Sequence, residues 1–217
     1  MNQEPSDTVD RLRNHWWWRP GWRQGRHFHA CHLTFDNQPD LHNLIERYQN
    51  ALRPFTGLDL IPRRWLHLTT QGIGYTDEIT DSEIDDIATA IRVRLNQLPT
   101  PVVSFRRPVV RQEAIYLPAE PPEPLAAVRT QIRAAIAEAL GAERLPEQRE
   151  QRAGFRPHVS LAYSNCDQPA EPISHALSLV PANPVTVTIT HASLLVLHRD
   201  QQMYEWTGEE QIGIGQP

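Results

Sequence analysis

The stretch RWLHLTTQGIG, residues 64–74, carries a histidine and a threonine, His67 and Thr69, separated by one leucine. Its apolar and β-branched residues predict a β-strand over 65–71. Successive side chains of a strand point to opposite faces, so His67 and Thr69 share one face and Leu68 lies on the other. We therefore expect this strand to bury an aliphatic face under helices and to present an imidazole beside a hydroxyl on its opposite face.

The same His-x-Ser/Thr spacing occurs at three other places, which are His32/Thr34, His158/Ser160 and His191/Ser193. Because the chain has 10 histidines, roughly one such match is expected by chance. FRPHVSLAY, residues 155–163, repeats the arrangement of the opening stretch, since Val159 and Leu161 alternate with His158 and Ser160. The pairs at 32 and 191 have apolar neighbours on the face of the histidine, which is more typical of a core or sheet-edge position.

Strand and helix patterns alternate along the rest of the chain. Strands are predicted at 27–35, 65–71, 101–110, 111–117, 155–163 and 185–197, with a short one near 203–206. Helices are predicted from an N-cap at Asp40 to about Arg53, from the capping box TDSE (80–83) to before Pro99, and over 125–139 up to Gly141. These strands and helices are separated by a proline-rich break at 118–124, a polar loop at 142–154 and a proline-rich loop before 185. This order favours an α+β or α/β chain with two lobes of similar build over a bundle or a sandwich.

The composition is that of an ordinary soluble protein, with 40% hydrophobic residues, 22% charged residues and a net charge of −5. This charge argues against DNA as a partner, because a long nucleic-acid interface needs a basic surface. It is compatible with a nucleotide or a single RNA end. All 21 basic residues are arginine, so every basic contact to a phosphate has to come from a guanidinium.

Metal, disulfide and membrane sites are not predicted. Cys31 and Cys166 lie too far apart in the sequence for a disulfide framework, and neither belongs to a Cys-x-x-Cys pair. His27 and His29 share a strand face that His32 does not, which suits no compact ligand set. No run approaches the roughly 18 apolar residues of a membrane-spanning helix, and the N-terminus lacks the apolar region of a signal peptide. We expect a cytoplasmic monomer without a membrane partner.

Two His-x-Ser/Thr units on facing strands have a chemical use. Cleavage of a phosphodiester requires one group that takes a proton from the attacking oxygen and another that gives a proton to the leaving oxygen. Histidine titrates near neutral pH, so two histidines can hold opposite protonation states at one pH. The two hydroxyls can donate hydrogen bonds to the non-bridging phosphate oxygens, where charge builds up in the transition state. Such a site needs no metal.

At these residues the chain resembles the 2H phosphoesterase superfamily, which includes 2'-5' RNA ligase-like proteins and cyclic phosphodiesterases. The matching stretches are HLTTQGIG (67–74) and FRPHVSLAY (155–163), with their histidines 91 residues apart. The element order from about residue 26 to 206 is similar to that family's fold. Ser160 stands where threonine is common, and both residues occur there in the family. The arm WWWRPGWRQGR (16–26) is outside the general family pattern and resembles a bacterial branch.

The resemblance implies an α+β fold of two similar β-sheet lobes with helices on the outside and a central cleft. It implies that His67, Thr69, His158 and Ser160 line that cleft, with the histidines acting as acid and base and with no cofactor. The implied substrate is a 2',3'-cyclic phosphate or a 2'-5' phosphodiester of a nucleotide or RNA end, and ligation in the reverse direction is the alternative. From the residues alone, a non-catalytic nucleotide or RNA-end binding module and a coincidental histidine pair stay open.

Two candidates for substrate binding follow from the second motif. Arg156, beside His158, can contact the substrate phosphate or form a surface salt bridge. Tyr163 can stack on a base or bind phosphate through its hydroxyl. Strict alternation, however, places Tyr163 on the face of Val159, where it would belong to the core.

Two further candidates come from the first half of the chain. Trp65 shares the predicted strand face of His67 with Gln71, and it can stack on a nucleobase or pack between the lobes. His32 lies in a strand that we expect beside the motif strands, so it can face the cleft.

Three segments are expected along the chain. Residues 1–25 form a Trp-rich N-terminal arm, 26–207 a single bilobal domain and 208–217 a flexible tail. The tryptophans of the arm, at positions 16, 17, 18 and 22, can cap the active site and stack on RNA, or anchor the arm on an apolar surface.

Overall fold

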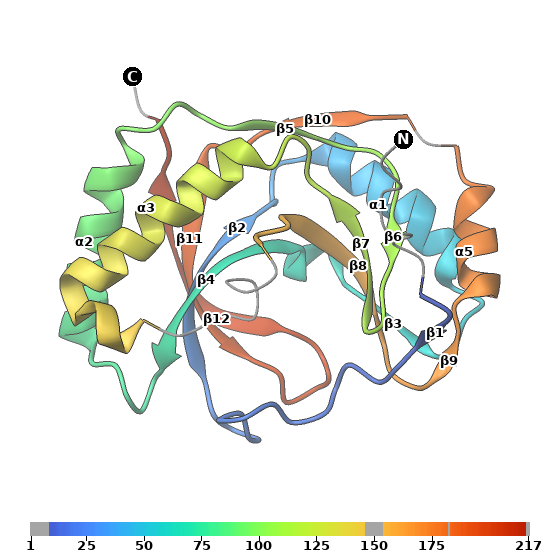
Figure 1. Ribbon diagram of the computed structural model, residues 1–217, viewed down its shortest axis with the longest axis horizontal. Helices are drawn as coiled ribbons and strands as arrows, with labels where there is room; N and C mark the ends of the chain where they lie inside the picture. The colour runs from blue at the N-terminus through green and yellow to red at the C-terminus, as the bar shows by residue number, and fades with distance from the viewer. Residues whose placement is uncertain (1–8, 146–153, 182, 216–217) are drawn as a thin grey trace.

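A large antiparallel sheet runs through the centre of the computed structural model, which describes residues 9–145, 154–181 and 183–215 (Figure 1). In spatial order its strands are β12 (Glu205–Gly213), β11 (His191–His198), β2 (Phe28–Thr34), β4 (His67–Tyr75), β8 (His158–Ser164), β7 (Ala114–Pro118) and β6 (Val109–Val110), with β3 (Leu58–Leu60) also paired to β8.

The sheet consists of two halves that meet between β4 and β8. We call β12, β11, β2 and β4 the first lobe and β8, β7, β6 and β3 the second lobe. Within each lobe neighbouring strands pair along most of their length. Between the lobes the register contains one pair, Leu68 opposite Val159. The expected α+β fold of two β-sheet lobes is confirmed.

Four helices of the described ranges cover the outer side of the sheet, and two of them cross from one lobe to the other. α2 (Asp81–Leu95) and α3 (Glu123–Leu140) pack together over the first lobe, and α1 (Pro39–Leu52) and α5 (Glu171–Ser178) pack together over the second (Figure 1). α1 follows β2 of the first lobe but contacts β8 and β3, whereas α3 follows β7 of the second lobe but contacts β4. This exchange explains why buried residues of both lobes form one hydrophobic cluster. In the part of the chain that the structure describes, no helix has both the length and the hydropathy that crossing a membrane requires.

Local signals set the helix ends. α2 begins with the expected capping box, in which the Glu83 backbone N–H donates to the Thr80 hydroxyl at 3.3 Å and the Thr80 N–H donates to the Glu83 carboxylate at 2.8 Å. α3 ends, as expected, at Gly141, whose φ is 91°. Asp40 is not the N-cap of α1, because Pro39 occupies the first turn and the N-cap is Gln38; the fixed φ of proline suits that position.

Some expected elements are divided or extended. Residues 63–65 form a short 3-10 turn, so β4 begins at His67 and not at 65. The segment 101–110 contains β5 (Val102–Phe105) and β6, and β5 pairs with β10 (Val185–Thr188) in a separate two-stranded sheet. α5 lies within the expected loop before 185. The expected loop at 142–154 falls mostly outside the described residues, which end at 145 and resume at 154.

The C-terminal strand was predicted too short. β12 continues to Gly213, and it pairs with β11 as far as His191 opposite Gly213. Ile212 and Ile214 are buried and anchor this end. Residues 208–213 are therefore part of the sheet, although they were expected in a flexible tail. The alternation of apolar and polar residues did not predict this part of the strand, because most side chains from 207 to 211 are exposed. Residues 216 and 217 lie outside the described part of the chain.

Candidate active site

A cleft of about 970 Å³ lies at the junction of the two lobes, on the face of the sheet opposite Leu68 and Val159. His67, Thr69, His158 and Ser160 all line it. Because Leu68 is paired with Val159 in antiparallel register, His67 stands across from Ser160 and Thr69 stands across from His158. The two motifs are thus related by an approximate twofold axis through that pair.

A β-bulge follows the hydroxyl residue in each motif strand. In β4 the register passes from His32 opposite Thr69 to Cys31 opposite Gln71, which leaves Thr70 as the extra residue. In β8 it passes from Tyr116 opposite Ser160 to Ile115 opposite Ala162, which leaves Leu161 as the extra residue. A bulge shifts the alternation of the side chains that follow it by one position. In β4 a second register shift, after Gly72, restores the original alternation, so that Tyr75 lines the cleft again.

The bulges correct two expectations from strict alternation. Gln71 does not share the face of His67; it accepts a hydrogen bond of 2.8 Å from Arg133 of α3, on the helical side. Tyr163 does not lie on the face of Val159; it lines the cleft at the position equivalent to Gly72 in β4. At this position after the histidine, β8 therefore presents a phenol ring to the cleft, whereas β4 presents a glycine.

The backbone orients both histidines in the same way. The Nδ1 of His67 lies 2.9 Å from the carbonyl oxygen of Trp65, and the Nδ1 of His158 lies 2.7 Å from that of Arg156. A carbonyl can only accept, so each Nδ1 carries a proton that it donates. In the neutral ring Nε2 then keeps its lone pair, and it is the nitrogen that can exchange a proton with a bound molecule.

Burial determines the protonation of these rings. Loss of solvent lowers the pKa of His67 below 6.5, the hydrogen bond to Trp65 partly offsets this, and the nearby charge of His158 lowers it further. Burial also lowers the pKa of His158, against the hydrogen bond to Arg156. At pH 7 both imidazoles are mainly neutral in the free protein.

An aromatic ring packs against each of the two motif histidines. His32 stacks on His67 with centroids 5.3 Å apart and an interplanar angle of 8°. Burial, together with the charge of His67, lowers the pKa of His32 to about 3, so His32 stays neutral beside its neighbour. Tyr116 packs on His158 at 4.1 Å. Tyr116 was not predicted, although the alternation in AIYLP would have placed it with Ala114 on the less apolar face of β7.

The four further candidates differ in their positions. Arg156, Tyr163 and His32 line the cleft. Trp65 is not among the described residues that line it; it lies in the 3-10 turn and packs edge-to-face on Trp206 with centroids 4.7 Å apart. The structure gives Trp65 a different role, because its carbonyl oxygen orients His67.

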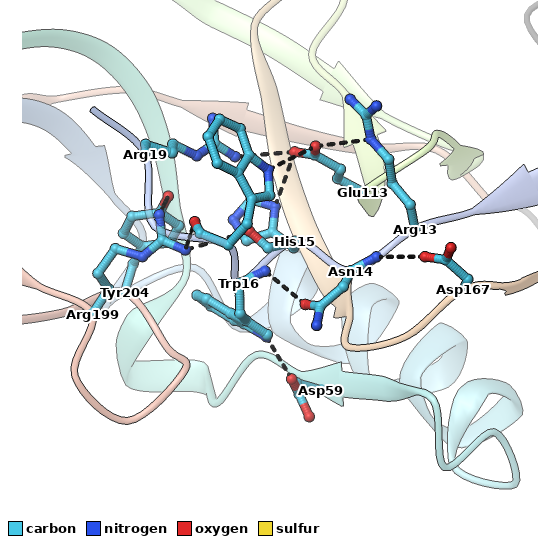
Figure 2. A network of polar contacts seen from close by, with 11 residues as sticks. Arg13, Asn14, His15, Trp16, Arg19, Asp59, Glu113, Asp167, Arg199 and Tyr204 are labelled. Carbon is cyan, nitrogen blue, oxygen red and sulfur yellow. Dashed lines mark hydrogen bonds and ion pairs between the residues drawn. The ribbon is translucent and has the colours of Figure 1, made fainter. Parts of the chain in front are cut away.

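The N-terminal arm forms one wall of the cleft. From the sequence, a cap over the active site and an anchor on an apolar surface were both open for this arm. Val9, Arg13, His15, Arg19, Pro20 and Trp22 of the arm are lining residues. His15 stacks on Tyr163 with centroids 4.3 Å apart, and Trp16 contacts the same ring edge-on. Figure 2 shows Arg13 and Arg19 converging on Glu113 from opposite sides, with His15 beside them.

The arm is attached to both lobes. β1 (Arg11–Leu12) pairs with β9 (Gln168–Pro169), which follows β8 of the second lobe. The Trp16 indole N–H donates to Asp59 of β3 at 2.7 Å (Figure 2). On the first lobe, the Arg199 guanidinium donates to the backbone oxygen of His15, and the Tyr75 hydroxyl donates to that of Pro20, both at 3.3 Å. The arm therefore spans the junction of the lobes.

Apart from His32, the residues of the two remaining His-x-Ser/Thr pairs meet at a different place. The hydroxyls of Thr34 and Ser193 lie 2.9 Å apart, and both donate to the carboxylate of Glu209, at 3.0 and 2.8 Å. The Nε2 of His191 lies 3.2 Å from the Thr34 hydroxyl. These residues link β2, β11 and β12 and do not line the cleft. Throughout the described ranges, no cluster of three or more His, Cys, Asp or Glu side chains is arranged to hold a metal ion.

Comparisons with known proteins agree with this fold. The chain is similar to TT0787 of Thermus thermophilus, with a TM-score of 0.63 and 22% identity over 88% of this chain and 100% of that one. Escherichia coli LigT in complex with 3'-AMP gives a TM-score of 0.59 at 13% identity, over 88% and 99%. The PDE domain of MHV ns2 gives 0.50 at 14% identity, over 87% and 99%. At these identities the likeness concerns the fold.

The sequence itself identifies the family. No curated protein matches the chain significantly. The family model of the 2'-5' RNA ligase superfamily matches residues 37–201, which is well over half of the chain and includes both histidine motifs. The chain therefore belongs to the 2'-5' RNA ligase superfamily of 2H phosphoesterases.

Proposed function

We propose that this protein is a metal-independent phosphoesterase that opens the 2',3'-cyclic phosphate, or cleaves a 2'-5' phosphodiester, of a nucleotide or RNA end. The observation that carries the proposal is the paired geometry of His67 and His158. Each ring donates its Nδ1 proton to a backbone carbonyl two residues earlier, and both rings line one cleft. Two equally oriented Nε2 atoms supply both proton transfers, and the reaction then requires no metal-bound water.

On a cyclic phosphate the two histidines act in one displacement. Water attacks the phosphorus while one histidine, neutral at Nε2, takes the proton of that water. The bond from phosphorus to the 2' or 3' oxygen breaks, and the other histidine, protonated at Nε2, gives that oxygen its proton. The products are a phosphomonoester and a free hydroxyl, and the proton has moved from one histidine to the other. In the ligation alternative, a hydroxyl of a second RNA end takes the place of water, and the same two groups open the cyclic phosphate into a 2'-5' phosphodiester. Cleavage of that diester by the neighbouring ribose hydroxyl, which forms the cyclic phosphate again, is the reverse of this step.

We assign phosphate binding to Thr69 and Ser160. Each lies two residues after a histidine on the cleft face and across the strand junction from the other histidine. Hydroxyl groups in this position can donate to the two non-bridging oxygens, whose charge grows as the water attacks. Arg156 and Tyr163 border the same space.

A nucleotide is the preferred substrate class. LigT has been crystallised with 3'-AMP, with ATP and with NADP+. In the present chain the rings of Trp22, Phe28 and Tyr75 line the cleft beside the histidines, and such rings can stack on a base. A module that binds RNA ends without catalysis would use the same surface but would form no product.

A substrate panel with matched variants tests the proposal. The panel contains nucleoside 2',3'-cyclic phosphates, 2'-5'-linked oligonucleotides and oligonucleotide pairs for ligation, all assayed with EDTA present. We expect turnover by the wild type and a loss of roughly 10²- to 10⁴-fold in kcat for His67→Ala and for His158→Ala. His191→Ala, which removes the histidine of an off-cleft motif, should retain activity. Equal turnover by all four proteins would refute the proposal, and tight binding without product would favour the binding module.

A further inference from the structure

The cleft is chemically polarised between its two halves. The first-lobe half presents Pro20, Trp22, Phe28, Gly72, Tyr75, Leu197 and Tyr204 around His67, and none of these side chains carries a charge. All charged residues among the described lining set belong to the other half, around His158. They are Arg13, Arg19, Arg111, Glu113 and Arg156. In this half the two arginines of the arm, Arg13 and Arg19, meet a single carboxylate, that of Glu113.

Glu113 holds the two arginines of the arm at the edge of the cleft. Its carboxylate accepts from the Nε of Arg13 at 3.1 Å and from the Nη2 of Arg19 at 3.0 Å (Figure 2). The contact with His15, with the charge of Arg19, lowers the pKa of Glu113 to about 2 despite burial. The cluster therefore contains two permanent positive charges and one negative charge.

The arm arginines remain able to bind an anion. A guanidinium has five N–H donors, and Arg19 gives one of them to Glu113. The side chain of Arg19 is 30% exposed and that of Arg13 is 49% exposed, although Glu113 between them is only 12% exposed. The carboxylate thus holds the two cations near one another, and both arginines line the cleft and stay partly exposed.

We propose that Arg13 and Arg19 form a second anion subsite, which binds a phosphate that the substrate carries in addition to the phosphate being cleaved. The inference rests on the proposed function and refines its substrate class. The preferred substrate is a nucleotide with a further phosphate, such as the 5'-phosphate of a terminal nucleotide in RNA, and not a nucleoside cyclic phosphate alone. The base lies toward the uncharged aromatic half, and the further phosphate lies toward the arm.

This subsite is contributed by a segment outside the region that the family model matches. The match begins at residue 37, whereas Arg13 and Arg19 are in the arm. The subsite is therefore specific to chains that carry such an arm, and its loss should change substrate preference without removing the paired histidines.

A minimal substrate pair tests the subsite in catalysis. We compare adenosine 2',3'-cyclic phosphate with its 5'-phosphorylated form, using the wild type, Arg19→Gln, Arg13→Gln and the double variant. For the wild type we expect kcat/KM to be about tenfold higher with the 5'-phosphate, as for one charge-assisted hydrogen bond. The double variant should lose this preference. Arg23→Gln is the matched control, since Arg23 is on the same arm but pairs with Asp77 away from the cleft.

Binding measurements separate this inference from the proposed function. Calorimetry compares adenosine 3'-monophosphate with adenosine 3',5'-bisphosphate on the same proteins. A tighter Kd for the bisphosphate in the wild type, lost in the double variant, supports the subsite even if neither cyclic substrate is turned over. That absence of turnover would count only against the proposed reaction on cyclic phosphates. Equal Kd and equal kcat/KM for both members of each pair in the wild type would overturn the subsite, as would a preference that survives in the double variant.

Discussion

Leu68 and Val159 face each other across β4 and β8, and each is the middle residue of a His-x-Ser/Thr motif. Both are fully buried. Their pairing joins the two lobes and at the same time sets the register in which the two histidines and two hydroxyls lie on the opposite face. The sheet junction and the candidate active site are therefore one structural feature.

Removal of the motif hydroxyls should slow the chemical step. For Thr69→Val and Ser160→Ala we expect kcat to fall roughly 10- to 1000-fold, because each change removes one donor to the developing charge. KM should change less, since the ground-state phosphate carries less charge on those oxygens. Steady-state kinetics on the best cyclic substrate measures both values. Thr186→Val, on the exposed side of β10, serves as the control; a fall in kcat similar to that of the motif variants would contradict the assignment.

The pH optimum should lie on the acid side of 6.5. Burial lowers the pKa of both His67 and His158 below that value. Above the optimum, the histidine that acts as the acid loses its proton and the rate falls. Below the optimum, the histidine that acts as the base becomes protonated and the rate falls as well. The profile of kcat/KM reports these groups in the free enzyme. A bell-shaped profile measured at constant ionic strength tests this, and an optimum above pH 7 would be inconsistent with it.

Trp16, in contrast to Trp17 and Trp18, should anchor the arm. Its ring is buried and its indole N–H donates to Asp59, while Trp17 and Trp18 are 48% and 49% exposed. Trp16→Ala should cost about 3 kcal/mol or more of local stability and should release the arm from the cleft. Hydrogen exchange over residues 9–26 would detect faster exchange in this variant. Trp17→Ala and Trp18→Ala should resemble the wild type; if all three behaved alike, the anchoring role would be wrong.

Stability should decrease as the pH falls below 6.5. His32 has its pKa lowered to about 3 by burial and by the charge of His67, whereas its unfolded value is near 6.5. Between these two pH values the unfolded chain binds more protons than the folded chain. The free energy of unfolding therefore rises with pH in this window, and the stabilisation disappears as the pH falls through it. The contribution of His32 is of the order of a few kcal/mol. Urea unfolding at several pH values measures the slope, and His32→Gln should make it shallower whatever its stability at pH 7.

The Tyr163 hydroxyl should affect substrate binding more than folding. The ring is buried between His15 and Trp16, so Tyr163→Phe retains the packing and should change the melting temperature little. Tyr163→Ala should cost about 3–5 kcal/mol through the cavity it leaves. If Tyr163→Phe bound the substrate as well as the wild type, the hydroxyl would have no role there.

Local patterns predicted much of the fold. The capping box at Thr80, the glycine stop at 141 and the period-2 pattern around His67 and His158 depend on neighbouring residues, and the structure has them where expected. Element ends that depend on partners were less predictable. β12 is extended by pairing with β11 although its side chains are exposed, and α5 begins within a proline-rich stretch.

The chain alone was enough to select His67/Thr69 and His158/Ser160, because alternation of side chains is a property of a single strand. It could not show that Gln71 leaves the cleft face and that Tyr163 joins it, because a bulge is a mismatch between two strands and has no mark in either one. Nor could it decide whether the arm lies at the cleft, since Arg19 meets Glu113 across 94 positions of sequence. Contacts of that kind arise only when the two lobes and the arm pack together.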